Sequence, residues 1–321
     1  MLQAHAAAAF LAALAITLAF GGPAIRAIRR MGLRSDVRED TPERHQAKAG
    51  TPSMGGLFLM PAAIVAMVAL APGVESAGVA LFAAAYGALG FTDDYTKARA
   101  GRGRGLKART KLAAQALLGI GMVAYTTQLI GRRGEIELPW SDKPVALGGW
   151  LYVLGIGVSI AVSNALNLTD GLDGLAAGSL VPVMVACVGA FALQDRTAYA
   201  VIAAALCGAC VGFLPFNVHP ARIWMGDTGS MALGGAVAAL AVFSGMEWFV
   251  TVAGLVFLAE MVSVMLQVAS FQTTGRRIFR MSPLHHHFEL GGARETVVVR
   301  GFWIASALCS LVALALMYRV P

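Results

Sequence analysis

Five aspartates stand where apolar segments of the chain end, and their grouping suggests cation chemistry. They are the adjacent pair Asp93-Asp94, followed by Asp170, Asp173 and Asp227. Neighbouring carboxylates repel one another, so a pair at the border of an apolar segment requires a cation or water-facing helix ends. Magnesium prefers carboxylates combined with phosphate and water, and no cysteine lies near these acids. The pattern therefore favours a magnesium site over a zinc site.

The stretch Asn164–Gly174 concentrates polar side chains between two apolar runs. It reads NALNLTDGLDG, with two Asn, one Thr and two Asp. Within a bilayer such groups need a ligand or a water-filled cavity. The glycines at 171 and 174 allow backbone N–H groups to approach a bound anion closely. An ordinary turn rich in Asn and Asp is the alternative interpretation.

Histidines and lysines on the same set of connections add candidate phosphate contacts. His285, His286 and His287 are consecutive and do not share one helical face, so they are poorly spaced to chelate one metal. Imidazole donates hydrogen bonds or protons to anionic oxygens. Lys48, Lys97 and Lys111 offer point charges to phosphate. The alternatives are a plain His-rich loop and lysines required only by membrane topology.

These residues must be positioned by membrane helices. Apolar residues make up 57% of the 321 residues and charged residues 13%, about half the share found in soluble domains. The mean hydropathy is +0.68, and apolar runs near 20 residues recur. We expect one all-α integral membrane domain covering residues 1–321. The four cysteines all lie in apolar runs, which indicates packing rather than metal or redox chemistry.

Ten membrane spans are predicted, the first being an uncleaved helix rather than a signal peptide. Their expected ranges are 1–20, 53–71, 75–92, 112–131, 149–166, 175–193, 197–216, 229–245, 247–270 and 298–318.

The basic residues predict the orientation of these spans. Twenty of the 25 Lys and Arg residues fall on the connections after odd-numbered spans, which places those connections in the cytoplasm and both termini outside. The same bias explains the net charge of +7 without a nucleic-acid partner. All the acids and histidines named above lie on the cytoplasmic connections, so a single cytoplasmic-face site is expected. The outer connection 132–148 contains an alternation at 135–138 that predicts a short hairpin.

The ninth span carries a polar face. Glu260, Ser263, Gln267 and Ser270 follow one another at helical spacing. A glutamate inside an apolar helix normally faces a cavity or a partner, and we expect this face to mark the polar end of a lipid cleft. Polar packing between helices is the alternative.

Five motifs together resemble the polyprenyl-phosphate N-acetylhexosamine-1-phosphate transferase superfamily. They are GTPSMGG at 50–56, Asp93-Asp94, NALNLTDGLDGLAAG at 164–178, MGDTGS at 225–230 and PLHHHFEL at 283–290. They span nearly the whole chain in the family's order. The HHH run and the TPSMGG segment resemble the peptidoglycan branch, the bacterial phospho-N-acetylmuramoyl-pentapeptide transferases.

The resemblance implies a reaction. Phospho-N-acetylmuramoyl-pentapeptide would pass from its UDP conjugate to undecaprenyl phosphate, releasing UMP and forming lipid I with Mg2+ as cofactor. The protein would be a multi-pass component of the bacterial cytoplasmic membrane, and a homodimer is left open. Two alternatives remain: a sister enzyme transferring N-acetylglucosamine-1-phosphate, and a transporter, whose acids would lie nearer the middle of the bilayer.

The resemblance also implies residue roles. Asp227 would bind Mg2+, Asp93 would deprotonate the lipid phosphate with Asp94 beside it, and Asp173 would contact uracil. Lys111, His285 and His286 complete the expected catalytic set. The expected substrate-binding set is Lys48, Ser53, Lys97, Asn164, Asn167, Asp170, Asp173, Asn217, Trp224, Gln267 and His287.

Three positions depart from the family's pattern. Trp224 replaces the usual Phe, and its larger ring can still stack on uracil. Ser53 replaces the commoner Thr and keeps the hydroxyl. Gly291-Gly292-Ala293 replaces Lys-Gly-Trp, which affects contacts at the tip of the last cytoplasmic connection rather than the chemistry.

Overall fold

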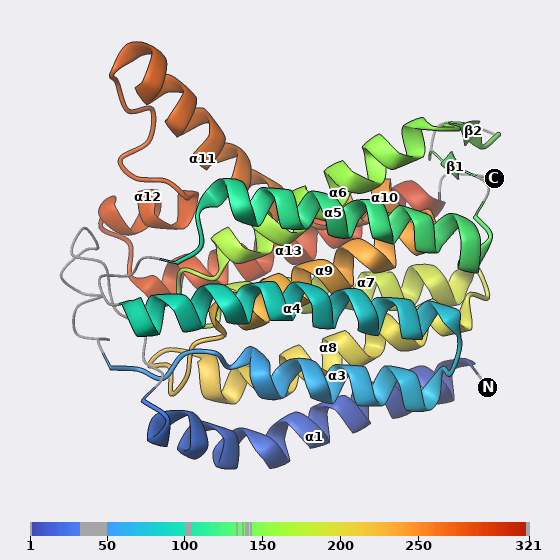
Figure 1. Cartoon of the computed structure of the whole chain (residues 1–321), viewed down its shortest axis with the longest axis horizontal. Helices are drawn as coiled ribbons and strands as arrows, with labels where there is room; N and C mark the ends of the chain where they lie inside the picture. The colour runs from blue at the N-terminus through green and yellow to red at the C-terminus, as the bar shows by residue number, and fades with distance from the viewer. Residues whose placement is uncertain are drawn as a thin grey trace.

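The computed structural model describes residues 2–32, 50–100, 105–132, 134–136, 138, 141 and 143–318, and these form a bundle of long helices (Figure 1). The helices run side by side along the long axis, and the chain's two ends lie at the same end of the bundle. Twelve α-helices occur in the described residues: α1 (Leu2–Arg30), α3 (Gly56–Leu70), α4 (Val74–Ala100), α5 (Ala108–Tyr125), α6 (Trp150–Thr169), α7 (Leu175–Leu193), α8 (Thr197–Asn217), α9 (Gly226–Ser244), α10 (Glu247–Ala253), α11 (Leu255–Thr274), α12 (Leu284–Leu290) and α13 (Glu295–Tyr318).

Length and composition confirm an all-α integral membrane protein. Nine of the described helices are long and apolar enough to cross a bilayer, since a helix satisfies its own backbone groups where water is absent. The remaining predicted span, 53–71, corresponds to α3, whose 15 residues reach only about 22 Å at 1.5 Å per residue. The first helix runs to Arg30, past Pro23 and beyond the predicted end at residue 20.

The prediction of one continuous helix over 247–270 is wrong. Gly254 separates α10 from α11, and its N–H donates to the carbonyl of Val250 at 2.8 Å. Glycine has the weakest helix preference of the non-proline residues, so a break there is inexpensive. Beyond it, α11 leans away from the bundle (Figure 1) and leaves Met265 60% and Phe271 55% exposed.

Helix α9 forms the centre of the bundle and is almost entirely buried. Glycines let its neighbours approach closely. A Cβ on Gly56 of α3 would lie 2.3 Å from the Cα of Gly229, and one on Gly90 of α4 would lie 2.1 Å from the carbonyl oxygen of Asp227. Because no side chain intervenes, the end of α4 that carries Asp93 reaches the start of α9.

Two arginines hold the other end of α9. The Arg132 Nη1 donates to the carbonyl of Val242 at 2.5 Å, and the Arg196 Nη1 donates to that of Ser244 at 2.6 Å. Arg132 also pairs with the buried Glu247, with Nη2 3.2 Å from Oε2. Cations at a helix C-terminus satisfy its free carbonyls and complement the helix dipole.

The short hairpin predicted within 132–148 is confirmed. Strand β1 (Glu135–Ile136) pairs antiparallel with β2 (Val145–Ala146), following the five-residue π-helix η1 (Thr126–Ile130). It lies at the end of the bundle that holds both termini (Figure 1). The packing role predicted for the cysteines is confirmed for Cys187, Cys207 and Cys210, which are buried in the hydrophobic core.

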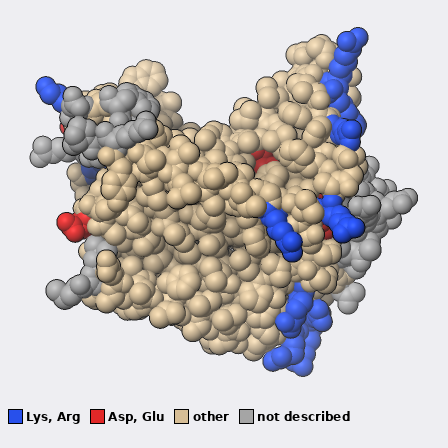
Figure 2. All heavy atoms as spheres, turned by 180° about the vertical axis from the view of Figure 1, so that it is seen from behind, with Lys and Arg blue, Asp and Glu red and all other residues tan. Residues whose placement is uncertain are grey.

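Positive charge gathers toward the opposite end. In Figure 2 most visible Lys and Arg side chains lie toward one end, while uncharged residues cover the broad middle of the face. The last turns of α1 and α4 bring Arg29, Arg30, Lys97 and Arg99 to this end. The candidate site lies there too.

Candidate active site

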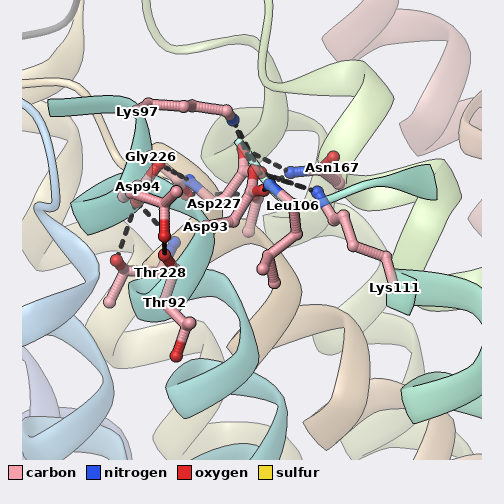
Figure 3. Close-up of polar contacts among 12 residues, drawn as sticks. Thr92, Asp93, Asp94, Lys97, Leu106, Lys111, Asn167, Gly226, Asp227 and Thr228 are labelled. Carbon is pink, nitrogen blue, oxygen red and sulfur yellow. Dashed lines mark hydrogen bonds and ion pairs between the residues drawn. The ribbon is translucent and has the colours of Figure 1, made fainter. Parts of the chain in front are cut away.

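Two aspartates and two lysines meet where α4 ends and α9 begins (Figure 3). The Lys97 Nζ lies 2.6 Å from the Oδ2 of Asp93 and 3.0 Å from the Oδ2 of Asp227. The Lys111 Nζ lies 3.2 Å and 2.8 Å from the same two oxygens. Each ammonium therefore bridges both carboxylates. We call these four residues the Asp–Lys cluster.

Local sequence explains how this cluster assembles. Asp93 and Lys97 are four residues apart on α4 and so share one helical face. Lys111 enters from the first turn of α5, and the N–H of Leu106, just before that helix, donates to the Asp93 Oδ1 at 2.6 Å. Asp93 is only 1% exposed. Three donors thus offset the burial of its charge.

Asp94 has a different role from its neighbour. Its carboxylate accepts the backbone N–H groups of Asp227 at 3.2 Å and Thr228 at 2.9 Å, together with the Thr228 hydroxyl at 2.7 Å. It therefore caps the N-terminus of α9 from another helix. Gly226 makes room for it, since this residue has φ +71° and an added Cβ would lie 2.7 Å from the Asp94 Oδ2. This geometry positions Asp227, and the catalytic role of Asp94 stays a prediction.

The asparagines of α6 approach the cluster from the side. The Asn167 amide donates to the Asp227 Oδ1 at 3.0 Å and to the Ser230 hydroxyl at 2.9 Å. Asn164, one turn earlier, donates to the Oε1 of Gln115 at 2.8 Å. Gln115 was missed from the sequence, although a fully buried amide in a membrane helix is itself a signal of a polar partner.

Asp170 lies just beyond α6, close enough to be affected by the cluster. Burial, followed by the negative charges of Asp227 and Asp94, raises the pKa of Asp170 well above its usual range. A hydrogen bond from the backbone of Gly226 acts in the opposite direction. Burial and the neighbouring carboxylates therefore both disfavour the ionised form of Asp170.

Asp173 and Trp224 come together beside this cluster. The indole Nε1 of Trp224 donates to the Asp173 Oδ1 at 3.1 Å, and the Ala221 N–H donates to Oδ2 at 3.0 Å. His219 and Glu295, which the sequence did not assign to the site, also reach this point. The His219 Nδ1 lies 3.2 Å from Asp173 and 3.3 Å from Glu295.

Asn217 joins the loops that carry these two residues. Its Oδ1 accepts the N–H of Gly174 at 3.2 Å, and its Nδ2 donates to the carbonyl of Ile223 at 3.0 Å. Asn217 is 2% exposed. Its amide therefore fixes the spacing between the 170–174 loop and the segment leading to Trp224.

The segment before α3 lies directly against the start of α9. The Trp224 N–H donates to the Pro52 carbonyl at 2.9 Å, the Gly55 N–H donates to the Trp224 carbonyl at 2.8 Å, and a third backbone bond follows from Gly56 to Met225. Ser53 lies next to Gly226, since a Cβ there would be 2.9 Å from the serine hydroxyl. Lys48 lies outside the described residues.

The three histidines have separate partners. They begin the short helix α12, and His285 and His286 are buried. The Nδ1 of His285 lies 2.9 Å from Glu260, that of His286 lies 2.9 Å from Glu289, and that of His287 accepts the Arg280 N–H at 3.1 Å. The expectation that they do not act as one chelating group agrees with this arrangement.

Gln267 is engaged by the connection between α11 and α12. Its Nε2 donates to the carbonyl of Phe279 at 3.0 Å, and its Oε1 accepts the N–H groups of Ile278 at 3.0 Å and Phe279 at 2.9 Å. Both ends of the amide are thus used within this connection. The structure does not bring Gln267 to the Asp–Lys cluster, and its substrate contact stays a prediction.

The donor set of the Asp–Lys cluster fits a hard cation. Asp93 and Asp227 offer carboxylate oxygens, and the cysteines lie elsewhere in the bundle. Among the described residues, Asp173, His219 and Glu295 also bring ligand atoms within 4.8 Å of one another. In this second group the oxygens of Asp173 accept the N–H groups of Trp224 and Ala221.

Comparison with known proteins places the chain in a family. The family model described as glycosyl transferase family 4 matches residues 76–245, and the phospho-N-acetylmuramoyl-pentapeptide-transferase signature 1 matches residues 48–58. The phospho-N-acetylmuramoyl-pentapeptide-transferase of Heliobacterium modesticaldum is 44% identical over 311 residues, covering 96% of this chain and 96% of the relative. This chain belongs to the phospho-N-acetylmuramoyl-pentapeptide-transferase family.

Two further relatives carry the same family name. The phospho-N-acetylmuramoyl-pentapeptide-transferase of Pelotomaculum thermopropionicum is 44% identical, covering 97% of this chain and 98% of the relative. That of Desulfitobacterium hafniense is 43% identical, with 93% of each covered. The matched signature contains Pro52 and Gly55, which pair with Trp224, and the longer match runs from α4 to α9. The longer match thus includes all three helices that carry the Asp–Lys cluster, α4, α5 and α9.

Proposed function

We propose that the chain transfers phospho-N-acetylmuramoyl-pentapeptide from its UDP conjugate to undecaprenyl phosphate, giving lipid I and UMP. The observation that carries the proposal is the meeting of the Asp–Lys cluster with the Asp173–Trp224 pair at one end of a membrane bundle. The first is suited to phosphate chemistry, and the second to a nucleotide base. The relatives' names supply the sugar and its peptide.

The uracil ring would lie on the Trp224 indole and present its N–H to Asp173. Stacking on a large aromatic ring is favourable, and a buried carboxylate strengthens a hydrogen bond from the base. Asn217 holds the two loops at the required spacing. Lys48 and Ser53 would add contacts from the segment before α3.

Both substrates are anionic where they react, so the site must offset their repulsion. Asp227 and Asp93 would hold Mg2+, which supplies positive charge at the diphosphate and stabilises the leaving UMP. The ammonium groups of Lys97 and Lys111 lie within 3.2 Å of these carboxylates and can pass from them to phosphate oxygens as substrate enters. The residues of this chain would therefore act chiefly by charge and alignment.

The lipid phosphate would attack directly. The second pKa of a phosphate monoester is about 6, so this group is largely dianionic at neutral pH and needs little help from a base. Asp93 accepts hydrogen bonds from two ammonium groups and the Leu106 N–H, so both of its oxygens are already engaged. Asp93 is better suited to organising cations than to forming an acyl-phosphate.

The lipid tail would lie between helices. An apolar cavity of about 350 Å³ is lined by side chains of α6, α7, α9, α10 and α11, including Val153, Ala161, Leu180, Val237 and Phe257. It accepts part of a long isoprenoid chain, while the rest extends into the bilayer along α11. The cavity supports a lipid substrate rather than a purely soluble one.

The orientation follows from charge. The cluster shares its end of the bundle with most of the basic residues, which supports a cytoplasmic-face site, termini outside, and residence of the single 1–321 domain in the bacterial cytoplasmic membrane. The aspartates of the site gather at one end of the bundle, which argues against a transporter. A homodimer stays a prediction.

A UMP-release assay in detergent micelles tests the proposal. With Mg2+, undecaprenyl phosphate and UDP-N-acetylmuramoyl-pentapeptide, we expect turnover that EDTA abolishes. UDP-N-acetylglucosamine should be at least about a hundredfold poorer, and the reverse preference would favour the sister enzyme. Without lipid phosphate, radiolabelled substrate should leave no stoichiometric label on the protein; such a label would establish a two-step route instead.

Trp224→Phe probes the base-binding pair. Phenylalanine keeps an aromatic face but lacks the N–H that donates to Asp173 at 3.1 Å. The Asp173 carboxylate loses a charge-assisted hydrogen bond that orients it. We therefore expect the KM for the UDP substrate to rise by about three- to tenfold while kcat stays nearly constant. Steady-state kinetics with the lipid substrate saturating measures this. A change in kcat alone would contradict the assignment.

A further inference from the structure

Glu260 and His285 form a buried pair between α11 and α12. Glu260 is 0% exposed and His285 1%. One carboxylate oxygen accepts the His285 backbone N–H at 3.1 Å, and the other lies 2.9 Å from its Nδ1. Because an ionised carboxylate only accepts hydrogen bonds, Nδ1 carries a hydrogen. Glu260 therefore fixes both the start of α12 and the orientation of the His285 ring.

The other ring nitrogen of His285 is unsatisfied. Its Nε2 is buried and has no hydrogen-bond partner among the described residues. It lies against Gly171, where an added Cβ would be 2.3 Å away. A buried polar atom without a partner costs free energy, so native proteins seldom keep one without a use. This atom is held against the same loop that carries Asp170 and Asp173.

The partners of the other two histidines differ in kind. Glu289, which pairs with His286, belongs to the same short helix, and Arg280, which donates to His287, lies just before it. His285, by contrast, is held by an acid from a separate membrane helix. Local contacts suffice to shape α12, whereas the Glu260 contact additionally sets where Nε2 points.

We propose that Glu260 is a positioning residue that holds the Nε2 of His285 for a hydrogen bond to the diphosphate of the nucleotide substrate. In the bound complex both ring nitrogens carry hydrogens, Nδ1–H donating to Glu260 and Nε2–H to a phosphate oxygen. The carboxylate balances the imidazolium charge, and Gly171 leaves room for the ring beside the loop. This inference rests on the proposed function and assigns the phosphate contact to one histidine of the three.

The polar face of α11 was expected to mark the polar end of a lipid cleft, but Glu260 has a protein partner instead. Glu260 faces His285 rather than an open lipid cleft, and Ser263 donates to the Glu260 carbonyl at 2.7 Å within the same helix. The polar face of α11 thus serves α12 and its connection. If the Glu260–His285 pair served only to attach α12 to α11, it would need the Nδ1 contact but would make no use of Nε2. A variant that keeps the first nitrogen contact and removes the second therefore tests the proposal.

His285→Asn separates the two nitrogens. The Asn amide can donate to Glu260 in place of Nδ1 but has nothing at the Nε2 position. By calorimetry in detergent, we expect the variant to bind UDP about tenfold to a hundredfold more weakly, and uridine within about twofold of the unchanged protein. Equal UDP affinity would overturn the inference. Failure of the unchanged protein to bind UDP would instead overturn the proposed function.

Glu260→Gln tests the positioning step. We expect this variant to lose UDP affinity by about the same factor as His285→Asn. Because Glu260 acts through the His285 ring, the double variant should bind UDP no more weakly than His285→Asn alone. Additive losses would refute that route. Glu247→Gln is the matched control, since it alters the buried acid paired with Arg132 at the opposite end; it should lower the melting temperature but leave UDP affinity unchanged. If Glu260→Gln does not fold, the His285→Asn comparison of UDP with uridine still decides.

Discussion

Replacing Asp227 with asparagine is expected to slow UMP release by about a thousandfold, because the change removes negative charge where a cation must bind. Asparagine keeps the shape and one carbonyl oxygen, so Asn167 retains an acceptor. The loss should fall on kcat and should not be restored by excess lipid phosphate. Steady-state assays over a range of Mg2+ concentrations measure it, and the Mg2+ concentration for half-maximal rate should rise.

Asp195→Asn provides a matched control for this change. Asp195 is exposed at the far end of the bundle and has φ +55°, a conformation that asparagine tolerates. The Asp195→Asn variant should have the same activity and melting temperature as the unchanged protein. Full activity of the Asp227 variant, with Asp195→Asn also unchanged, would remove Asp227 from the site.

Lys111→Met should lower kcat by about a hundredfold. Lys111 is the less exposed of the bridging lysines, at 17% for its side chain against 37% for Lys97. A charge nearer the interior is less screened and therefore contributes more to phosphate binding in the transition state. Methionine keeps the apolar stem, so the packing of α5 is preserved. Turnover under saturating substrates measures the effect.

Lys97→Met gives the comparison. We expect a loss of about tenfold, smaller than for Lys111→Met, because solvent partly screens this ammonium. If both lysines served only to neutralise Asp93 and Asp227, adding Mg2+ would compensate for their loss. Recovery of full activity at high Mg2+ would therefore contradict the proposed phosphate contact.

The sequence predicted the membrane class, most helix ranges and the short outer hairpin, because hydropathy and turn chemistry are local. It also named Asp173 and Trp224 together, and the structure places their side chains 3.1 Å apart. It did not predict the break at Gly254, since one glycine in an apolar run is compatible with a continuous helix. Such breaks depend on how the following helix packs.

The features of the site that the sequence did not predict depend on contacts between residues far apart in the chain. The carboxylate of Asp94 caps α9 across more than 130 residues of chain, and no spacing rule links these positions. Glu260 was recognised as unusual from its helical face, yet its partner on α12 was not. Side-chain identity shows that a polar group needs a partner, but only the packing of helices determines which partner it receives.

The two helices that carry parts of the site, α9 and α11, differ in how firmly the bundle holds them. Asp94 closes the first turn of this helix, Arg132 and Arg196 close the last, and the residues between are almost wholly enclosed. Helix α11, by contrast, leans outward beyond Gly254 and offers much of its surface to lipid. Asp227 thus stands at the start of a buried helix that is braced at both ends, whereas His285 is held by Glu260 on the helix that leans outward. We therefore expect the distance between α12 and the Asp–Lys cluster to vary more than the shape of the cluster itself.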